Sequence, residues 1–313
     1  MPSDGVLGVV VIGVGIAGRV RIRDIGDTAF PERKWNLIGY VSRRTLEIAD
    51  AHQITEEEAL TRPDVDVIVL CTEPHAHESV IRRALEHGKH VLVEFPVATS
   101  SRVTEELYTL AEQKGLILHE ENIALLTPSF RFLNERLQAI ELPITSAEIH
   151  FTGSYNGWTE DFEKSGGPFC ANVSLLQTMY VLLGNCSLTA TGGQLQVNDD
   201  GFLATAKLSC EKCKDITITI KRTREKSARS KEIKFVIADG TVVKDTPDKP
   251  PPTPPSSQAP RKPGLFMEDW LKFVAAVRET GDHAAGAART RHCIRVADAL
   301  HAFMGLRGDE APS

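Results

Sequence analysis

The fold of the first half of the chain is decided by residues 7–18, which read LGVVVIGVGIAG. A short run rich in Val and Ile over 6–12 is typical of a buried strand, and a helical pattern follows over 17–25. The spacing GxGxxG between them permits a tight turn, close backbone approach to a pyrophosphate and close helix–strand packing. The segment therefore predicts a dinucleotide-binding turn. The expected cofactor contacts are Gly13, Val14, Gly15, Ile16, Ala17 and Gly18.

Short apolar runs and helical patterns alternate through the first 124 residues. Further strands are expected at 37–41, 65–70, 91–93 and 116–118, and further helices at 56–60, 77–86 and 101–113. Strands separated by helices form βαβ units, which build a parallel sheet with right-handed crossovers. We therefore expect residues 1–124 to form a doubly wound α/β domain that binds the cofactor.

The pattern changes after residue 124, where strands follow one another across short turns. They are expected at 144–152, 188–197, 202–210, 215–221, 232–238 and 241–243, with one helix at 173–183. Such a series predicts a large, mostly antiparallel sheet with one packed and one open face. Residues 125–313 are thus expected to form an α+β domain. It would include a Pro-rich loop over 246–263 and two helices over 265–280 and 289–306.

Composition limits the classes of function. The 313 residues are 42% hydrophobic and 25% charged, which is ordinary for a globular protein of two domains. The net charge of −6 gives no general basic field for nucleic acid or an anionic membrane. Six scattered cysteines and no run long enough to span a bilayer predict free thiols and a cytoplasmic location.

The second strand is followed by Ser42, Arg43 and Arg44. An NAD-selective site usually has an acidic residue here, which binds the ribose hydroxyls. A hydroxyl and two guanidinium groups suit the 2′-phosphate of NADP instead. We therefore predict NADPH as the cofactor and disfavour NADH. The alternative is a pair of solvated arginines.

The end of the third strand carries Thr72, His75 and His77. In a doubly wound sheet this edge lines the ligand crevice, so Thr72 and His77 are candidate cofactor contacts. Each also has a structural interpretation, Thr72 as a helix cap and His77 as an anchor for the helix that follows. The two histidines have no third ligand, so we predict no metal there.

These motifs together resemble the Gfo/Idh/MocA oxidoreductases. The resemblance includes Thr72-Glu73-Pro74, His77, the Gly-Lys-His-Val run at 88–91 and Glu94-Phe95-Pro96. It is strong over 8–126 and thin over 145–260, and within the family it is greatest to the biliverdin-reducing members. It implies an N-terminal Rossmann domain and a second domain whose open sheet floors the active site.

The departures from the family pattern concern proton transfer. Sugar-oxidising members have Lys between Glu and Pro, where this chain has Phe95, and Asp and His where it has Gln177 and Ser174. Without a group that accepts a hydroxyl proton, alcohol oxidation is disfavoured. Biliverdin-reducing members usually have Tyr at position 95, Arg at Leu175 and an acidic residue at Ala124.

The resemblance implies a mechanism in heme catabolism. NADPH would lie with its nicotinamide near Glu94, Phe95 and Pro96, and hydride would pass to the central methine bridge of biliverdin IXα to give bilirubin. Glu94, Phe95 and Glu121 are the candidate catalytic residues, and Glu94 is also a candidate cofactor contact. The proton would come from water or a nearby acid.

Cations at the end of one predicted strand are candidates for the substrate propionates. They are Lys221, Arg222 and Arg224, and a solvated basic strand end is the alternative. Cys210 and Cys213 form a CxxC that we interpret as a plain hairpin. The pair His292-Cys293 matches a position linked to zinc in the family, but helix packing is favoured and zinc stays open.

Two other functions remain open. Phe95 and Leu175 raise the alternative of another conjugated or imine substrate, reduced with the same cofactor. The eight prolines within 247–263 raise a third, a catalytically silent NADP(H)-binding protein that works through partners docked on this tract. A plain surface loop is the simpler interpretation of the tract.

Overall fold

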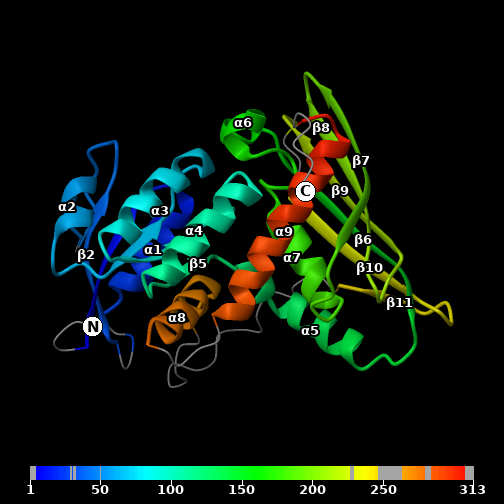
Figure 1. Ribbon diagram of the computed structural model, residues 1–313, viewed down its shortest axis with the longest axis horizontal. Coiled ribbons are helices and arrows are strands. Elements are labelled where there is room, and N and C mark those ends of the chain that lie inside the picture. Colours follow the sequence, from blue (N-terminus) through cyan, green and yellow to red (C-terminus); the bar gives the residue numbers. More distant parts are fainter. Residues whose placement is uncertain are drawn as a thin grey trace. The chain divides into compact units, whose positions relative to one another are not determined.

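The computed structural model describes residues 5–28, 30, 33–49, 51–225, 229–245, 263–278 and 283–306. Its contacts divide the chain into two compact units, and Figure 1 shows the elements of each. The first unit comprises residues 1–98, 102–123 and 263–288. The second comprises residues 99–101, 124–262 and 289–313.

The first unit contains a five-stranded parallel sheet in the order β2-β1-β3-β4-β5. The strands are β1 (Leu7–Ile12), β2 (Trp35–Val41), β3 (Val67–Leu70), β4 (His90–Val93) and β5 (Leu118–Glu120). The helices between them are α1 (Ile16–Gly26), α2 (Glu56–Thr61), α3 (His77–Glu86) and α4 (Ser101–Gln113), with a 3-10 turn at Pro74–Ala76. All side chains of β1 and β3 are buried, as helices on both faces of a sheet require. The doubly wound fold is confirmed.

Helix α8 (Leu265–Val277) belongs to the first unit. Trp270 is fully buried and meets Trp35 edge-on, with ring centroids 5.6 Å apart. This differs from the expected boundary, which assigned residues 265–280 to the second domain. Apolar periodicity shows that a helix is buried but not which core receives it, so the sequence could not place α8. The division at residue 124 otherwise stays a prediction.

The second unit contains a six-stranded sheet in the order β11-β10-β6-β9-β8-β7. The strands are β6 (Ile144–Ser154), β7 (Thr189–Asn198), β8 (Gly201–Ser209), β9 (Asp215–Thr223), β10 (Ser230–Ile237) and β11 (Val242–Lys244). All neighbours are antiparallel except β6 and β9, which are parallel. The mostly antiparallel sheet is confirmed.

Buried and more exposed side chains alternate along the strands of this sheet, so one of its faces is packed. On β9, Ile216, Ile218 and Ile220 are buried, whereas Thr217 is partly exposed and Lys221 exposed. Figure 1 shows α7 beside the sheet. The helical elements are α5 (Pro128–Gln138), α6 (Phe162–Ser165), α7 (Val173–Leu182) and most of α9 (Ala284–Phe303), with 3-10 turns at Ile123–Leu125 and Gly157–Glu160. Of these, α5 and α6 were not predicted.

None of the helices in the described ranges combines the length and apolar character that crossing a membrane requires. The same ranges hold no group of three or more His, Cys, Asp or Glu side chains arranged to bind a metal ion. The Pro-rich tract lies outside the described residues except for Pro263. A docking role for the tract therefore stays a prediction, as does the cytoplasmic location.

Candidate functional site

In the glycine turn after β1, packing leaves no room for a side chain at two of the three glycines and leaves open space at the other. Gly13 has φ +95°, and a Cβ there would lie 2.6 Å from the carbonyl oxygen of Cys71. A Cβ at Gly18 would lie 2.0 Å from the carbonyl oxygen of Gly13. A Cβ at Gly15, by contrast, would meet nothing within 4 Å. Packing thus requires the first and third glycines, while the second leaves open space where a ligand can approach the backbone.

Helix α1 begins at this turn without a side-chain cap. Its N-cap is Gly15, which has no side-chain oxygen to accept hydrogen bonds from the first-turn N–H groups. Ile16 is 92% exposed, Ala17 is partly buried and Val14 is buried. The amides and the positive end of the helix dipole are therefore offered to an anion, and a pyrophosphate group fits them.

The loop after β2 presents the two predicted arginines. Gln53 holds this loop, because its Nε2 donates to the carbonyl oxygens of Ser42 (2.9 Å) and Arg44 (3.1 Å). The hydroxyl of Ser42 accepts from the backbone N–H of Arg44 at 3.1 Å. Arg43 and Arg44 are exposed, and within the described chain neither guanidinium forms an ion pair. The loop is ordered by Gln53, which the sequence did not single out, and both positive charges are left uncompensated.

Thr72 follows β3 and lies against the glycine turn. Its Cγ2 is 3.0 Å from the place where a Cβ at Gly13 would lie. Its hydroxyl oxygen is buried and has no hydrogen-bond partner. A buried hydroxyl without a partner costs free energy, so such groups usually meet a ligand or water. Thr72 therefore stays a candidate cofactor contact.

The structure places His77 as a support rather than as a ligand-contacting residue. Its ring is fully buried, with Nδ1 2.8 Å from the carbonyl oxygen of Pro96 and Nε2 3.0 Å from that of Thr72. Burial lowers the pKa of His77, although both carbonyl contacts oppose this effect. The ring ties the end of β3 to the loop after β4 and has no free nitrogen for the cofactor contact we expected.

Glu94 follows β4 and is bound by a buried arginine. Its Oε1 accepts from Nε of Arg21 at 3.1 Å, and its side chain is 15% exposed. Nη2 of Arg21 donates to Oδ2 of Asp269 at 2.7 Å, and Nη1 donates to the carbonyl oxygen of Phe266 at 2.9 Å. Burial alone would lower the pKa of Arg21, but the charges of Asp269 and Glu94 raise it overall.

Asp269 joins this network to β5. Its Oδ1 lies 3.0 Å from Nε2 of His119 and accepts from the backbone N–H of Asn122 at 3.3 Å. The carboxylate is fully buried. Burial raises its pKa, but His119 and Arg21 outweigh this effect and lower the pKa to about 2. Asp269 is therefore an anion that holds the network together.

Glu120 and Glu121 end β5 and have different surroundings. Glu120 is buried, and its Oε2 accepts from the backbone N–H of Val97 at 2.6 Å, which fixes the loop that contains Phe95. Glu121 is 2% exposed, and its Oε1 accepts from the backbone N–H of Ile123 at 2.6 Å. Burial first, and then the negative charges of Glu94 and Asp269, raise the pKa of Glu121 well above its ordinary value. These effects favour the protonated form of the Glu121 carboxyl group.

Three titratable groups meet where β3, β4 and β5 end. Burial raises the pKa of Glu94, and the charge of Arg21 opposes that rise. Burial and the charge of Glu94 raise the pKa of the Cys71 thiol. Phe95 is half-buried beside Glu94 and has no proton to transfer. This edge therefore holds one carboxyl group paired with Arg21, that of Glu94, and one whose pKa is raised by burial and by neighbouring negative charge, that of Glu121.

Arg222 is a partly buried arginine of the second unit. Nη2 donates to Oδ1 of Asn172 at 2.6 Å, Nη1 donates to the carbonyl oxygen of Ser154 at 3.0 Å, and Nε is buried without a partner. The guanidinium groups of Arg222 and Arg229 each lie 5.4 Å from the centroid of the Phe151 ring. No carboxylate of the described chain pairs with either. Burial and the charge of Arg229 lower the pKa of Arg222 to about 10.

The other two predicted cations at this strand end differ from Arg222. Arg224 forms a two-bond pair with Glu160, at 2.8 and 3.0 Å, so its charge is already compensated. Lys221 is exposed. Leu175 and Gln177 are both buried in α7. Of the three cations, Arg222 is the one that is partly buried and has no carboxylate partner within the described chain.

The sequence did not identify the residues that support Glu94. Arg21 and Asp269 are 248 residues apart, and no local motif links them. One signal was available, because Arg21 shares a helix face with Gly18, Ile22 and Ile25, which are buried. A charged residue on an apolar face predicts a buried partner of opposite charge.

The chain matches known oxidoreductases. The profile of the Gfo/Idh/MocA oxidoreductase family, which has an NAD-binding Rossmann fold, matches residues 7–122. Biliverdin reductase A from Mus musculus is 43% identical over 208 residues, which are 65% of this chain and 67% of the mouse protein. Biliverdin reductase A from Homo sapiens is 40% identical over 206 residues, 66% of this chain and 68% of the human protein.

Solved structures share the fold over nearly the whole chain. The biliverdin reductase of Synechocystis sp. PCC 6803, in complex with biliverdin and NADP+, has a TM-score of 0.74 at 19% identity and covers 96% of this chain and 99% of its own. GenD2 from gentamicin A biosynthesis, in complex with NAD, has a TM-score of 0.78 at 17% identity and covers 96% and 94%. At these identities the likeness shows the fold.

Proposed function

The chain belongs to the Gfo/Idh/MocA oxidoreductase family, as its motifs predicted, and within that family we propose that it reduces biliverdin IXα to bilirubin with NADPH. The family membership makes it an oxidoreductase with an NAD-binding Rossmann fold. The two relatives named biliverdin reductase A, at 43% and 40% identity, support the substrate.

The observation that carries the proposal is the buried carboxyl group of Glu121 at the edge of the first sheet. Reduction of a conjugated bridge takes up a hydride and a proton, so it needs a proton donor, whereas alcohol oxidation needs a base. Burial and the charges of Glu94 and Asp269 raise the pKa of Glu121, which favours the protonated form of its carboxyl group. At the position where sugar-oxidising relatives have Lys, Phe95 has no basic group. We assign Glu121 as the proton donor.

Glu94 has a positioning and electrostatic role in this proposal. Arg21 fixes its carboxylate, and the negative charge of Glu94 helps to keep Glu121 protonated. Once Glu121 has given up its proton, Glu94 and Glu121 are both anionic; the charge of Arg21 partly offsets this state until a proton from water restores the acid. Glu120 and His77 hold the intervening loop at Val97 and Pro96. The orientation of Glu94 and of the loop that follows it is then fixed by side chains that are themselves held by hydrogen bonds.

The glycine turn and the arginine loop would hold the cofactor. The open space at Gly15 and the uncapped start of α1 fit the pyrophosphate, and the orphaned hydroxyl of Thr72 faces the same turn. Among the described residues the guanidinium groups of Arg43 and Arg44 form no ion pair, and they suit a 2′-phosphate. When bound, NADPH supplies the hydride.

Arg222 would bind a substrate carboxylate. A half-buried guanidinium without a counter-ion is destabilising in the free protein, and an anion that pairs with it recovers that energy. Biliverdin has two propionates and a flat conjugated skeleton. The ring of Phe151 and the guanidinium of Arg229 add a flat surface and a second positive charge beside Arg222.

An assay of purified protein with biliverdin IXα, NADPH and NADH tests the proposal. We expect bilirubin absorbance to appear with NADPH and only weakly with NADH. Glu121→Gln should lower kcat by about 10²- to 10⁴-fold with cofactor affinity unchanged, because the amide cannot donate a carboxyl proton. Glu86→Gln, at an exposed residue near the end of α3, is the matched control and should leave kcat unchanged. Turnover at the unmodified rate in Glu121→Gln would refute this assignment.

Phe95 and Leu175 favour one alternative, a different conjugated or imine substrate for the same cofactor. A panel of tetrapyrroles and cyclic imines separates the two, because only the alternative predicts faster turnover on a molecule other than biliverdin. Tight NADPH binding without turnover on the panel would instead identify a silent cofactor-binding protein.

A further inference from the structure

The edges of the two sheets differ in how they are protected. An edge strand has unpaired backbone N–H and C=O groups, so it can pair with another chain unless it is short, charged or covered. The edges are β2 and β5 in the first sheet and β11 and β7 in the second. β5 and β11 have three residues each, and Nζ of Lys244 in β11 lies 3.1 Å from Oε1 of Glu232. β2 is covered, since the N–H of Tyr40 donates to the carbonyl oxygen of His52 at 2.8 Å.

β7 has none of these protections. Its ten residues read TATGGQLQVN, with no charged residue and no proline. Among the described residues it pairs with β8 alone, and Figure 1 shows it at the border of the second sheet. The pairing shifts register between Ala190 and Gly192, so the regular part of the strand is residues 193–198. This part of β7 can therefore accept a further strand.

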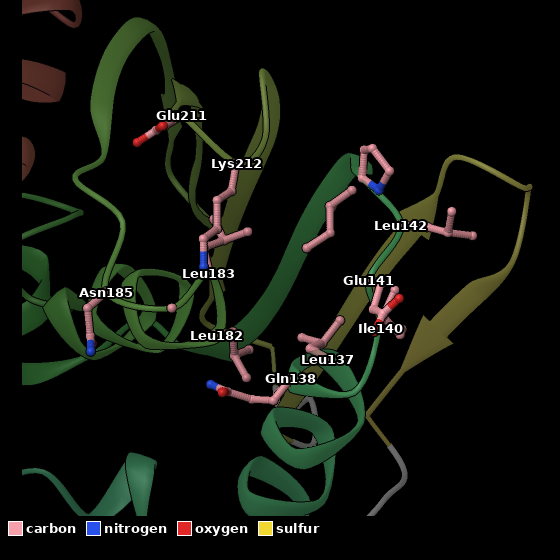
Figure 2. Close-up of a pocket in the computed structure, with 13 residues that line it drawn as sticks. Leu137, Gln138, Ile140, Glu141, Leu142, Leu182, Leu183, Asn185, Glu211 and Lys212 are labelled. Carbon is pink, nitrogen blue, oxygen red and sulfur yellow. The ribbon is translucent and has the colours of Figure 1, made fainter.

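The start of β7 follows shortly after Asn185, which lines a cavity of about 650 Å³ (Figure 2). Lys212, from the turn between β8 and β9, lines the same cavity. Three leucines of its lining, Leu137, Leu182 and Leu183, are 6%, 3% and 1% exposed, so a ligand would cover little further surface on them. Exposed apolar side chains lie instead near the other end of β7.

The apolar side chains that are exposed there come from β7 itself and from α9. Val197 is 56% exposed, and Phe303 of α9 is 54% exposed. α9 packs on this part of the strand, because a Cβ at Gly193 would lie 3.0 Å from the carbonyl oxygen of Leu300 and 3.2 Å from Cβ of Phe303. A strand paired with β7 opposite Gly193 would bring its own side chain beside Phe303.

Side chains of β7 alternate between the two faces of the sheet. Gly193, Leu195 and Val197 lie on the packed face, because the residues paired with them on β8 are buried. Gln194 and Gln196 lie on the open face and are exposed. A strand that extends the sheet here must therefore have apolar residues at alternate positions and uncharged residues between them.

We propose that β7 pairs with β7 of a second copy of this chain, antiparallel and about a two-fold axis at Leu195. In this register Leu195 faces Leu195 of the second copy, and Gln194 faces Gln196, so that their amides can hydrogen-bond. Val197 faces Gly193 of the second copy, which covers Val197 and places it beside Phe303. The two-fold axis closes the assembly at two chains. The surface uses no residue assigned to the cofactor or to the reaction.

The second copy is the occupant because β7 itself has the pattern that its edge requires. It has apolar residues at 193, 195 and 197 or no side chain at all, uncharged amides between them, and no charge that would repel an identical strand. Segments of the chain outside the described ranges lack this pattern. Residues 307–313 read RGDEAPS, with three charged residues and a proline, and residues 246–262 are rich in proline, which cannot donate to a strand ladder.

Sedimentation of the full chain from low to high micromolar concentration tests the proposal. We expect a reversible monomer–dimer equilibrium, because an interface of one strand pair is small and weak. Gln194→Lys with Gln196→Lys puts like charges opposite one another and should weaken dimerisation at least about tenfold. Gln194→Glu with Gln196→Glu should do the same, and an equimolar mixture of the two variants should dimerise again. Thr219→Lys adds a charge to the open face on β9, away from the edge, and should dimerise like the unmodified chain.

Cysteine substitution tests the register. Residues directly opposite each other in antiparallel strands have Cα atoms about 4.5–5.5 Å apart, which a disulfide can span. Leu195→Cys should therefore form an intermolecular disulfide on mild oxidation. Val197→Cys should not, because Val197 faces Gly193. Non-reducing electrophoresis measures both, and the unmodified chain, which has six cysteines, gives the background.

Three results would overturn the proposal. One is a monomer at every concentration. Another is a dimer that Gln194→Lys with Gln196→Lys leaves intact, or that Thr219→Lys dissociates, since the open face of the sheet would then form the interface. The third is cross-linking through Val197→Cys in place of Leu195→Cys. Circular dichroism and thermal denaturation check that each variant is folded.

Discussion

The first unit contains a buried arginine, Arg21, and the second a partly buried one, Arg222, and the two differ in what surrounds them. Arg21 in the first unit binds two carboxylates, those of Glu94 and Asp269, and its pKa is raised. Arg222 in the second unit binds an amide and a carbonyl oxygen, has an unpartnered Nε, and has a pKa lowered to about 10. Among the described residues, Arg21 has carboxylate partners, whereas Arg222 has only neutral ones.

This difference in partners distinguishes a charge with a structural role from a charge that can bind a ligand. A buried cation with two carboxylate partners gains nothing from a further anion, and its removal leaves those carboxylates unpaired. A cation without a carboxylate partner gains most when an anion binds. We therefore expect the loss of Arg21 to change stability first, and the loss of Arg222 to change substrate affinity first.

The largest effect is expected for Arg21→Ala. Removing one partner of a buried ion pair leaves an uncompensated charge, and the free energy of unfolding should fall by about 3–5 kcal/mol. Chemical denaturation measures this change. Arg23→Ala is the matched control, because Arg23 lies on the same helix with a 69% exposed side chain. A loss below about 1 kcal/mol for Arg21→Ala, the size typical of an exposed pair, would break the comparison.

The pH dependence of stability tests the same network through the carboxylate of Asp269. Asp269 has a pKa of about 2 in the folded chain, against 3.8 ordinarily. A depressed folded pKa adds stability that is present above the ordinary value and is lost as the pH falls through the folded value. Between about pH 5 and pH 1 the protein should lose about 2–3 kcal/mol through this group. Denaturation at several pH values should show a shallower acid slope in Asp269→Asn, and an unchanged slope would contradict the assignment.

Arg222→Leu tests the other half of the comparison. We expect the KM for biliverdin to rise about 10- to 100-fold, which corresponds to one lost charged hydrogen bond, with stability changed by less than about 1 kcal/mol. Arg224→Leu, which removes a cation already paired with Glu160, should leave KM near its original value. Biliverdin dimethyl ester should be insensitive to Arg222→Leu. Equal loss with acid and ester would show that Arg222 does not bind a carboxylate.

The smallest effect is expected for Arg43→Ala and Arg44→Ala, since both side chains are exposed. Each should weaken NADPH binding by about tenfold and leave NADH binding unchanged, because only NADPH has the 2′-phosphate. Fluorescence titration measures both affinities. Arg19→Ala, at an exposed residue of α1, is the control. Parallel weakening of NADPH and NADH binding would argue against phosphate recognition by this loop.

Local sequence patterns predicted the elements that are also local in the structure. The glycine turn, the strand before it and the arginines after β2 each depend on a few adjacent residues, and Glu94 and Glu121 follow from their positions after β4 and β5. The partners of these residues could not be predicted, because Asp269 reaches Arg21 across 248 residues. Likewise, the pairing with Glu160 that distinguishes Arg224 from Arg222 spans 64 residues.

Hydride transfer to biliverdin is the central claim, and deuterium labelling tests it most directly. Purified protein would be incubated with biliverdin IXα and NADPH carrying deuterium at C4 of the nicotinamide, and the product analysed by NMR and mass spectrometry. The account predicts bilirubin with one deuterium at the central bridge and none at the pyrrole nitrogens after exchange in light water. Bilirubin without deuterium at that bridge, or deuterated cofactor left unconsumed in the presence of biliverdin, would contradict it.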